Sequence, residues 1–407
     1  MLNRFPARRS RLLRSGAVLS VLAVVVAGCD GSGFGAGATS GDNDPTAETS
    51  GVAAAAALIS TNVPDGATGV HVDRKVRVTT EHGRLSSVTV RSRAGMVPGT
   101  IAADGSRWVA TELLEPGARY RVRAVAQGED GKQTQSVSSF TTQALTLDQQ
   151  TFPAVAPLAG ETVGIGMPVI VTFDLPVTDK AAFERHMTVT TAPRQPGSWR
   201  WVSDTVAHWR PRHYWQAHTK VDVDIDVNGV PAGGGIYGQE DRKVAFSVGD
   251  AHVYKVNART HQMRVFQNGR LLRTLPITTG KPGFTTRSGV KVIMEKFPVK
   301  RMNSETVGIA RGSAEAYDID DVRWAMRLTS SGEFIHAAPW SVGSQGHANV
   351  SHGCTGMSTD NAAWLYSRTR RGDVVEYVGT DRQMEADNGY GDWNIPWRQY
   401  KAASALH

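Results

Sequence analysis

The sequence predicts a mainly β protein in which two tandem β-sandwiches precede a third β-rich domain that holds one helix. Two segments, 120–125 and 221–227, alternate between apolar and polar residues, which is the period of a strand with one face in water. A faint internal repeat relates residues 58–146 to residues 147–249. The pattern of strands and turns changes from about Asp250, which indicates that a new domain begins there.

The repeat consists of a turn followed by an apolar strand. In the first unit a turn at 64–66 leads to a strand at 76–79, and in the second a turn at 157–160 leads to a strand at 169–172. Each unit closes with another alternating run. Short strands separated by Gly and Pro turns favour two immunoglobulin-like β-sandwich domains. One long β-domain is the alternative, and the repeat disfavours it.

The third domain, 250–378, is predicted to open with a β-meander. Strands at 253–256 and 263–266 flank one turn, and Asn268-Gly269 signals a second turn before the next strand. One helix is expected late in this domain, because Ser358–Asn361 offers capping groups immediately before an apolar run.

The two ends of the chain differ from the domains between them. Residues 1–28 combine a basic start with a short apolar run and end like a bacterial lipobox, so they predict a lipoprotein signal peptide with Cys29 as the acylated residue. A plain signal peptide or an uncleaved anchor is the alternative. Residues 29–57 are predicted to form a flexible tether, and the tryptophan-rich segment 379–407 to pack on the domains. The bulk of the chain is therefore expected outside the cytoplasm, anchored by lipid to the outer face of the cytoplasmic membrane.

Length and charge limit the classes of partner. A chain of 407 residues is long enough for two to four domains. Its formal net charge is +7, but the arginines and lysines look scattered along the sequence and no nucleic-acid motif is present. The sequence therefore argues against a nucleic-acid partner, and the charge suits a protein close to an anionic envelope.

Cys354 is the residue that suggests chemistry. The chain has two cysteines, and Cys29 is explained by the leader, so Cys354 is an unpaired thiol in an exported protein. It closes the run Ser351-His352-Gly353-Cys354, and His336 ends an apolar strand upstream. A histidine facing a thiol on the next strand can remove its proton, while the amides of Gly353 and Cys354 can face a developing oxyanion. A metal site or an inert buried cysteine is the alternative; a cysteine acyl-transfer enzyme is favoured.

His336 with Ser351-His352-Gly353-Cys354 resembles the signature of the L,D-transpeptidases of bacterial cell-wall assembly, and the order of segments resembles the mycobacterial members. The resemblance implies that Cys354 attacks the meso-diaminopimelate carbonyl of a donor tetrapeptide stem and releases D-alanine. His336 would act as base and then acid, held by the backbone carbonyl of Ala337. The side-chain amine of an acceptor stem would resolve the thioester into a 3→3 cross-link. His352 would line the pocket and support the cysteine.

The resemblance also implies residues that contact the substrate. Residues 301–318 resemble the family's active-site flap, in which Tyr317 would cover the acyl group near the oxyanion and Met302 would line the substrate path. Core packing of the flap is the alternative for both. The turn Ser331-Gly332 resembles a stretch that contacts the donor, and Trp340 is near enough to form a wall, although packing is favoured for it.

One position departs from the family pattern. Members commonly follow the cysteine with an apolar residue and then Asn or Arg, whereas this chain has Thr355-Gly356. Gly356 would offer only its backbone to the substrate, which affects donor affinity but not the thiol chemistry.

The resemblance leaves three possible functions for the chain. Transpeptidation is the leading function, hydrolysis would make the protein an L,D-carboxypeptidase, and an inactive wall-binding lipoprotein is the non-enzyme alternative. We expect acylation of Cys354 by carbapenems, no cofactor, no metal and a monomer.

Overall fold

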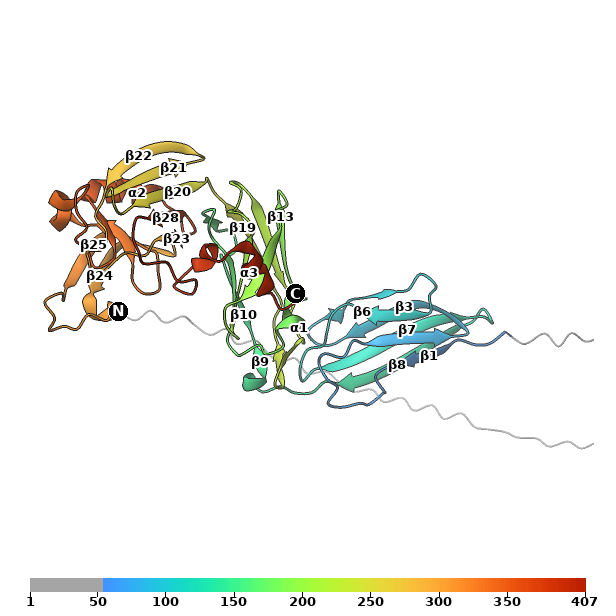
Figure 1. Ribbon diagram of the computed structural model, residues 1–407. Helices are drawn as coiled ribbons and strands as arrows, with labels where there is room; N and C mark the ends of the chain where they lie inside the picture. Colours follow the sequence, from blue (N-terminus) through green and yellow to red (C-terminus); the bar gives the residue numbers. More distant parts are fainter. Residues whose placement is uncertain (1–53) are drawn as a thin grey trace, which may run out of the picture. The chain divides into compact units, whose positions relative to one another are not determined.

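The computed structural model describes residues 54–407, which form three β-rich regions (Figure 1). The predicted signal peptide, Cys29 and nearly all of the predicted tether lie outside the described residues. Within residues 54–407 no helix is both long and apolar enough to cross a membrane.

The first sandwich consists of two four-stranded sheets, with strand orders β1-β2-β6-β5 and β4-β3-β7-β8. Alternating side chains of β7 form part of its core: Tyr120, Val122 and Ala124 point inward, and the side chains between them point to the solvent. Tyr120 stacks on Phe140 in this core, with ring centroids 5.2 Å apart. The strands are β1 (Leu58–Thr61), β2 (Arg77–Glu81), β3 (Gly83–Arg91), β4 (Met96–Val97), β5 (Gly99–Ile101), β6 (Arg107–Ala110), β7 (Arg119–Gly128) and β8 (Gln133–Thr141).

The second sandwich pairs the sheets β10-β12-β15-β14 and β11-β19-β16-β13 and adds the small sheet β17-β18-β9. Large aromatic side chains fill its core; Trp209 and Trp215 stack with ring centroids 5.3 Å apart. Its elements are η1 (Leu147–Gln149), β9 (Gln150–Thr151), β10 (Pro153–Ala156), β11 (Thr162–Val163), β12 (Val169–Phe173), α1 (Lys180–Glu184), β13 (Met187–Ala192), β14 (Gly197–Trp201), β15 (Val206–Pro211), β16 (Lys220–Ile225), β17 (Pro231–Gly233), β18 (Ile236–Gly238) and β19 (Arg242–Val248).

The third region contains a five-stranded sheet, β22-β21-β20-β28-β23, and a four-stranded sheet, β24-β25-β26-β27. Asn268 and Gly269 both have positive φ, as the predicted hairpin turn requires. The elements are β20 (His252–Asn257), β21 (Gln262–Gln267), β22 (Arg270–Pro276), β23 (Gly289–Val292), β24 (Glu295–Asn303), η2 (Ser304–Val307), β25 (Asp318–Arg327), β26 (Phe334–Ala337), η3 (Pro339–Ser344), β27 (Thr355–Met357), α2 (Thr359–Arg368), β28 (Val374–Val378), η4 (Gly391–Asn394) and α3 (Trp397–Ala402).

Helix α2 is the helix that the sequence predicts after the cysteine. The Ser358 hydroxyl accepts a hydrogen bond from the Asn361 N–H at 3.3 Å, so the cap forms as expected. Ala362 and Leu365 face the core, which they share with Ile335 of β26. The mainly β fold class, with two sandwiches before a region that carries this helix, is confirmed.

The tryptophan-rich tail forms structure that the sequence did not predict, namely η4 and the short helix α3. The Trp393 indole N–H donates to the Gly166 carbonyl at 2.8 Å. The Arg210 guanidinium lies over the rings of Trp393, Trp397 and Tyr400, with 4.2 Å to the Tyr400 centroid. Aromatic packing around one arginine therefore holds this segment.

Candidate active site

His336 and Cys354 are brought together by two neighbouring parallel strands. All four residues of β26 are buried, and His336 pairs in register with Gly356 of β27. Cys354 directly precedes β27, so the thiol is presented at the end of that strand beside the histidine. Parallel pairing therefore joins two positions that lie far apart in the sequence.

The His336 ring is fixed by its own backbone neighbour. Its Nδ1 lies 2.8 Å from the Ala337 carbonyl oxygen, which is the contact that the resemblance implied. Because a carbonyl only accepts, Nδ1 carries the proton and Nε2 is left as an acceptor. Burial lowers the pKa of His336, while the hydrogen bond to Ala337 opposes that shift. The imidazole is therefore held neutral with a basic nitrogen available.

The segment before the thiol is a bend, and hydrogen bonds of the Ser351 hydroxyl hold it. The Ser351 hydroxyl donates to the Cys354 carbonyl at 2.6 Å and accepts from the Gly353 N–H at 3.1 Å. Gly353 has φ +124°, a conformation that a side chain would strain. His352 lies in this bend. The expectation that the Gly353 amide faces an oxyanion is wrong, because Ser351 takes that N–H.

The Cys354 thiol is protonated in this arrangement. Its Sγ lies 3.7 Å from the Gly332 carbonyl oxygen, and within residues 54–407 it forms no hydrogen bond with His336. The residue is half-buried, and enclosure by protein raises the pKa of the thiol to about 12. The thiol and the neighbouring imidazole are therefore both neutral, and the thiol would have to lose its proton before it could act as a nucleophile.

A buried charged cluster of Arg287, Lys291 and Glu333 lies close to the thiol. Arg287 Nη1 is 3.1 Å from Glu333 Oε1, and the Lys291 ammonium contacts the other carboxylate oxygen. Lys291 is fully buried, and its ammonium also lies 3.8 Å from the centroid of the Tyr377 ring. Glu333 raises the pKa of the Cys354 thiol and Lys291 lowers it. The negative and positive charges of the cluster therefore shift the pKa of the thiol in opposite directions.

Two cavities meet at Cys354. One, of about 240 Å³, is mostly apolar and is also lined by His336, Trp340 and His352. The other, of about 280 Å³, is lined by Gly332 and by the basic residues Lys300, Arg301 and Arg327. Met302, Tyr317 and Cys354 line both. The thiol can therefore be approached from two sides.

The predicted flap residues lie at this junction. Met302 on β24 and Tyr317 just before β25 face both cavities, so neither is simply core. Burial, with a smaller contribution from Cys354, raises the pKa of the Tyr317 hydroxyl to about 12, which keeps it protonated. Trp340 is 56% exposed, its ring stacks on His336 with 5.9 Å between the ring centroids, and it lines the apolar cavity, so it packs on the histidine and also forms a cavity wall.

Two of the predicted substrate residues are not brought to the cavities. Ser331 is bonded to Asn388: its N–H donates to Oδ1 and its hydroxyl accepts from Nδ2, both at 2.9 Å. Gly356 is buried in β27, and its N–H and C=O are both bonded to Thr278. A Cβ there would lie 2.9 Å from the Ala338 Cβ. The substrate role predicted for Gly356 is therefore wrong: its glycine serves close packing. Gly332, by contrast, lines the cavity as expected.

His352 lines the apolar cavity, and its hydrogen-bond partner is a carboxylate that no local sequence pattern indicates. Its Nε2 lies 2.7 Å from Glu315 Oε2, and Glu315 also pairs with Lys281 at 2.5 Å. The hydrogen bond from Lys281 and then that from His352 lower the pKa of Glu315. The His352 ring lies 5.1 Å from that of Tyr317. Glu315 therefore ties the flap to the cysteine loop.

The charged cluster could have been suspected from the sequence. Lys291 stands inside the apolar run 290–293, and Glu333 begins the apolar strand that carries His336. A charge in a buried strand needs a partner, which is the signal that sequence reasoning missed. Among residues 54–407 no group of three His, Cys, Asp or Glu side chains is placed to hold a metal ion.

Comparisons with known proteins match both parts of the chain. Residues 67–231 match the family described as Bacterial Ig domain, and residues 251–376 match the L,D-transpeptidase catalytic domain. L,D-transpeptidase 2 of Mycobacterium tuberculosis (strain CDC 1551 / Oshkosh) is 38% identical over 85% of this chain and 85% of its own length. L,D-transpeptidase 5 of Mycobacterium tuberculosis (strain ATCC 25618 / H37Rv) is 36% identical over 84% of this chain and 76% of its own length. A solved LD transpeptidase in complex with imipenem is 40% identical, covering 55% of this chain and 97% of that chain with a TM-score of 0.49.

Proposed function

We propose, from the premise that the chain belongs to the L,D-transpeptidase family, that Cys354 and His336 are the pair with which it forms peptidoglycan cross-links. The chain is a peptidoglycan L,D-transpeptidase and acts outside the cytoplasm, as the resemblance implied. The observation that carries the proposed pair is the bond from His336 Nδ1 to the Ala337 carbonyl. It leaves Nε2 unprotonated on the strand next to the thiol, where a base is needed.

The first half-reaction starts from the neutral pair. The Cys354 thiol turns from the Gly332 carbonyl toward His336, and Nε2 takes its proton as Sγ attacks the diaminopimelate carbonyl of the donor stem. The tetrahedral intermediate collapses when the bond to D-alanine breaks and His336 returns the proton to the leaving amine. The products are free D-alanine and a thioester on Cys354.

The second half-reaction uses the other approach to the thiol. The side-chain amine of an acceptor stem attacks the thioester carbonyl and gives a proton to His336. The C–S bond then breaks as the new amide forms, and His336 returns the proton to Sγ, which restores the Cys354 thiol. Two cavities that share Cys354 suit a reaction in which one stem occupies the acyl site while another delivers the amine. We assign the apolar cavity to the donor acyl chain and the basic one to the carboxylate-bearing acceptor.

The oxyanion donors in this proposal are the Cys354 N–H and the Tyr317 hydroxyl. Within residues 54–407 no backbone group accepts a hydrogen bond from the Cys354 N–H. Tyr317 lines both cavities beside the thiol, and its raised pKa keeps the hydroxyl a donor. Donors that are already in place stabilise the developing charge without reorganising during the step. His352 supports the site indirectly, through Glu315 and the flap.

Incubation with a disaccharide tetrapeptide, followed by mass spectrometry, tests the proposal. A cross-linked dimer with loss of D-alanine is expected, and Cys354→Ala or His336→Ala should abolish it. His347→Ala is the matched control, because His347 is an exposed histidine that lines neither cavity. Tripeptide monomer alone would identify a carboxypeptidase instead, and unchanged substrate would argue for an inactive wall-binding protein.

Carbapenems supply an independent probe of the nucleophile. Sγ of Cys354 would attack the lactam carbonyl in the same site, and the strained lactam C–N bond would break as its nitrogen takes up a proton. Cys354 would then remain acylated. A mass increase equal to one carbapenem is expected for the full chain and should be absent in Cys354→Ala. A mass increase that survived this substitution would refute the assignment.

The remaining parts of the chain are assigned supporting roles. Residues 58–146 and 147–249 would act as spacer domains for a catalytic domain at 250–378, with 379–407 as a packing segment and the chain as a monomer. Cys29, in the part of the chain that the structure does not describe, would carry the lipid anchor after removal of residues 1–28. Metabolic labelling with a fatty acid, lost in Cys29→Ala, checks this assignment.

A further inference from the structure

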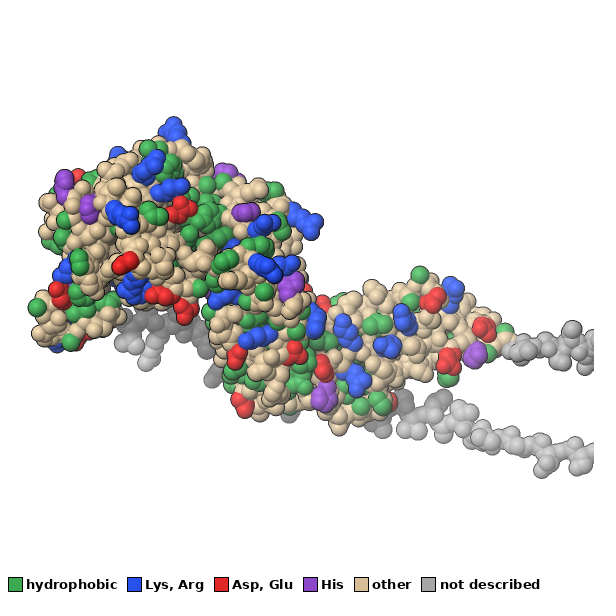
Figure 2. Space-filling model, viewed as in Figure 1, with side chains coloured by type: hydrophobic (Ala, Val, Ile, Leu, Met, Phe, Trp, Pro, Cys, Tyr) green, Lys and Arg blue, Asp and Glu red, His purple; other side chains and the backbone are tan. Residues whose placement is uncertain are grey.

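The outward face of β7 in the first sandwich gathers arginines that look scattered in the sequence. Arg119, Arg121 and Arg123 alternate with buried residues, so all three point to the same side. On the neighbouring strand β3, Arg91 pairs in register directly opposite Arg121. Basic side chains are visible over β7 and its neighbours in Figure 2. The sequence-based impression of scattered charge is wrong here, because strand alternation and register bring the charges together.

These arginines are not neutralised by acidic neighbours. Among residues 54–407, none of Arg91, Arg93, Arg119 and Arg121 forms an ion pair. Asp65 is the carboxylate that lines the same hollow, and its Oδ1 accepts a hydrogen bond from the Ser139 N–H at 2.7 Å. Like charges opposite each other on a sheet repel. Binding of an anionic partner would therefore relieve the repulsion between the arginines of this face.

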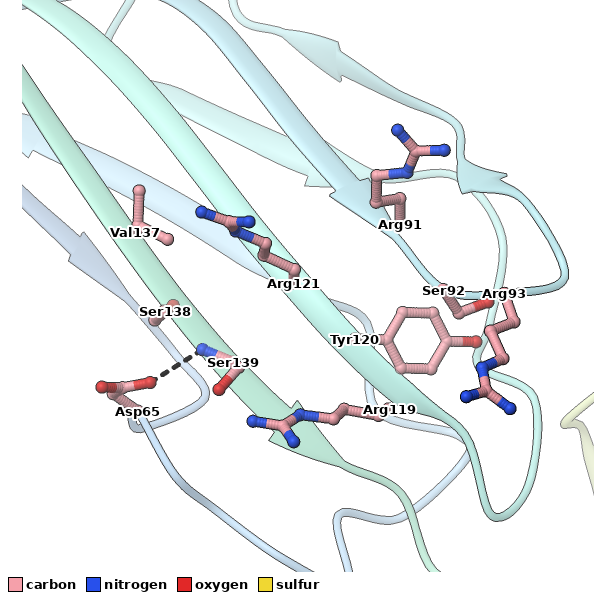
Figure 3. A pocket seen from close by; sticks show the side chains of 10 residues that line it. All are labelled: Asp65, Arg91, Ser92, Arg93, Arg119, Tyr120, Arg121, Val137, Ser138 and Ser139. Atoms are coloured by element: carbon pink, nitrogen blue, oxygen red, sulfur yellow. Dashed lines mark hydrogen bonds between the residues drawn. The ribbon is translucent and has the colours of Figure 1, made fainter. Parts of the chain in front are cut away.

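The four arginines are among the residues that line an open hollow, and Figure 3 shows their side chains. The hollow has a volume of about 640 Å³ and lies on the first sandwich, apart from the residues that line the two cavities at Cys354. Hydroxyl groups and one exposed apolar side chain, Val137, complete it. We call it the basic hollow, and its lining residues are Asp65, Arg91, Ser92, Arg93, Arg119, Tyr120, Arg121, Val137, Ser138 and Ser139.

We propose that the basic hollow binds peptidoglycan itself, through the carboxylates of stem peptides that are not being cross-linked. Guanidinium groups bind carboxylates through two parallel hydrogen bonds, and the serines can add neutral ones. Every uncross-linked stem ends in a carboxylate, and the stems repeat along the strand on which this enzyme acts. A concave site with forked donors suits discrete carboxylates on a polymer, whereas a membrane surface needs no hollow.

The consequence for the enzyme is a second attachment to its substrate. Once the basic hollow holds one stem, further stems of the same wall are confined near the catalytic domain, which raises their effective concentration. This inference goes beyond the proposed catalytic pair and does not depend on it, because binding can be measured without turnover.

Co-sedimentation of the full chain with insoluble purified peptidoglycan tests the proposal. Arg91→Gln with Arg121→Gln should weaken binding about tenfold at low salt, because charge-assisted hydrogen bonds are lost. Arg77→Gln with Arg107→Gln is the matched control: it removes the same charge from the other sheet of the first sandwich and should leave binding nearly unchanged. Amidation of the peptidoglycan carboxylates should weaken binding of the unsubstituted chain to the same extent.

Several results would overturn the proposal. Equal losses in both double variants would mean that only net charge matters, and no loss in Arg91→Gln with Arg121→Gln would exclude the hollow. Unchanged binding to amidated peptidoglycan would exclude carboxylates. Loss of binding to phosphatidylglycerol vesicles, with peptidoglycan binding intact, would assign the hollow to a membrane surface. Turnover of soluble disaccharide tetrapeptide should stay unchanged in the variant, so failure of this site and failure of the catalytic pair are distinguishable.

Discussion

The basic hollow of the first sandwich and the charged cluster beside Cys354 both gather cationic side chains, under opposite conditions. In the hollow, Arg91 and Arg121 are exposed and have no acidic partner among the described residues. In the cluster, Lys291 and Arg287 are buried and share the carboxylate of Glu333. One group of charges is solvated and open to a ligand, whereas the other is enclosed and already compensated.

The difference follows from the cost of removing a charge from water. An exposed guanidinium keeps its hydration, so it can remain unpaired at little expense to the fold. A buried ammonium loses its hydration and requires a partner within contact distance. Unpaired cations on a surface are therefore free to bind an anionic ligand, whereas paired cations in a core have a structural or electrostatic role. Substitutions in both groups of charges and the pH dependence of Cys354 alkylation test this distinction.

The largest expected effect is the loss of the shared carboxylate. Glu333→Leu would leave Lys291 and Arg287 buried without their common partner, which should lower the free energy of unfolding by about 3–5 kcal/mol. Urea denaturation followed by amide exchange of peptides from β23 and β26 measures this loss. Glu315→Leu, which removes a partly exposed carboxylate of the flap, is the control and should cost much less. Equal losses would remove the distinction between buried and exposed charge.

An intermediate effect concerns the reactivity of the thiol with pH. Because the pKa of Cys354 is raised to about 12, its alkylation by iodoacetamide should be slow at neutral pH and rise about tenfold per pH unit toward that value. The raised pKa also means that the folded state holds this proton more tightly, so its contribution to stability is lost as pH rises from about 9 to 12. Lys291→Gln should slow alkylation further, since Lys291 lowers the pKa of Cys354.

A plateau of the alkylation rate between pH 7 and 8 would contradict this picture. It would mean that the resting enzyme holds a thiolate and an imidazolium, with Sγ already turned toward His336. His336→Gln separates the two cases, because only a preformed pair would lose its neutral-pH reactivity on that substitution.

The smallest expected effect is on the stability of the first sandwich. Arg91→Gln with Arg121→Gln should change its free energy of unfolding by no more than about 0.5 kcal/mol, with a small gain favoured by relief of cross-strand repulsion. Amide exchange of peptides from β3 and β7 in urea measures the change. A loss of 2 kcal/mol or more would show that these arginines hold the sandwich together and are not reserved for a ligand.

Local sequence patterns predicted most of the secondary structure that surrounds the site. The alternating run at 120–125 lies in β7, the Asn268-Gly269 turn has the required backbone, and Ser358 caps α2. Each of these features depends on neighbouring residues alone, so the sequence carries the information. Helix α3 was missed because its stability comes from packing around Arg210, which is distant in sequence.

The residue types and order of the motif around Cys354 and of the upstream His336 were enough to predict the family and the candidate reacting pair from the sequence. Which further groups surround this pair depends on the folded chain. Glu333, immediately before β26, contacts Lys291 of β23, Glu315 contacts His352 from the flap, and Gly356 is packed in the core and does not line a cavity. The register of β3 with β7 likewise turned apparently scattered arginines into one face. Burial and cross-strand distance decide these roles, and both are properties of the folded chain.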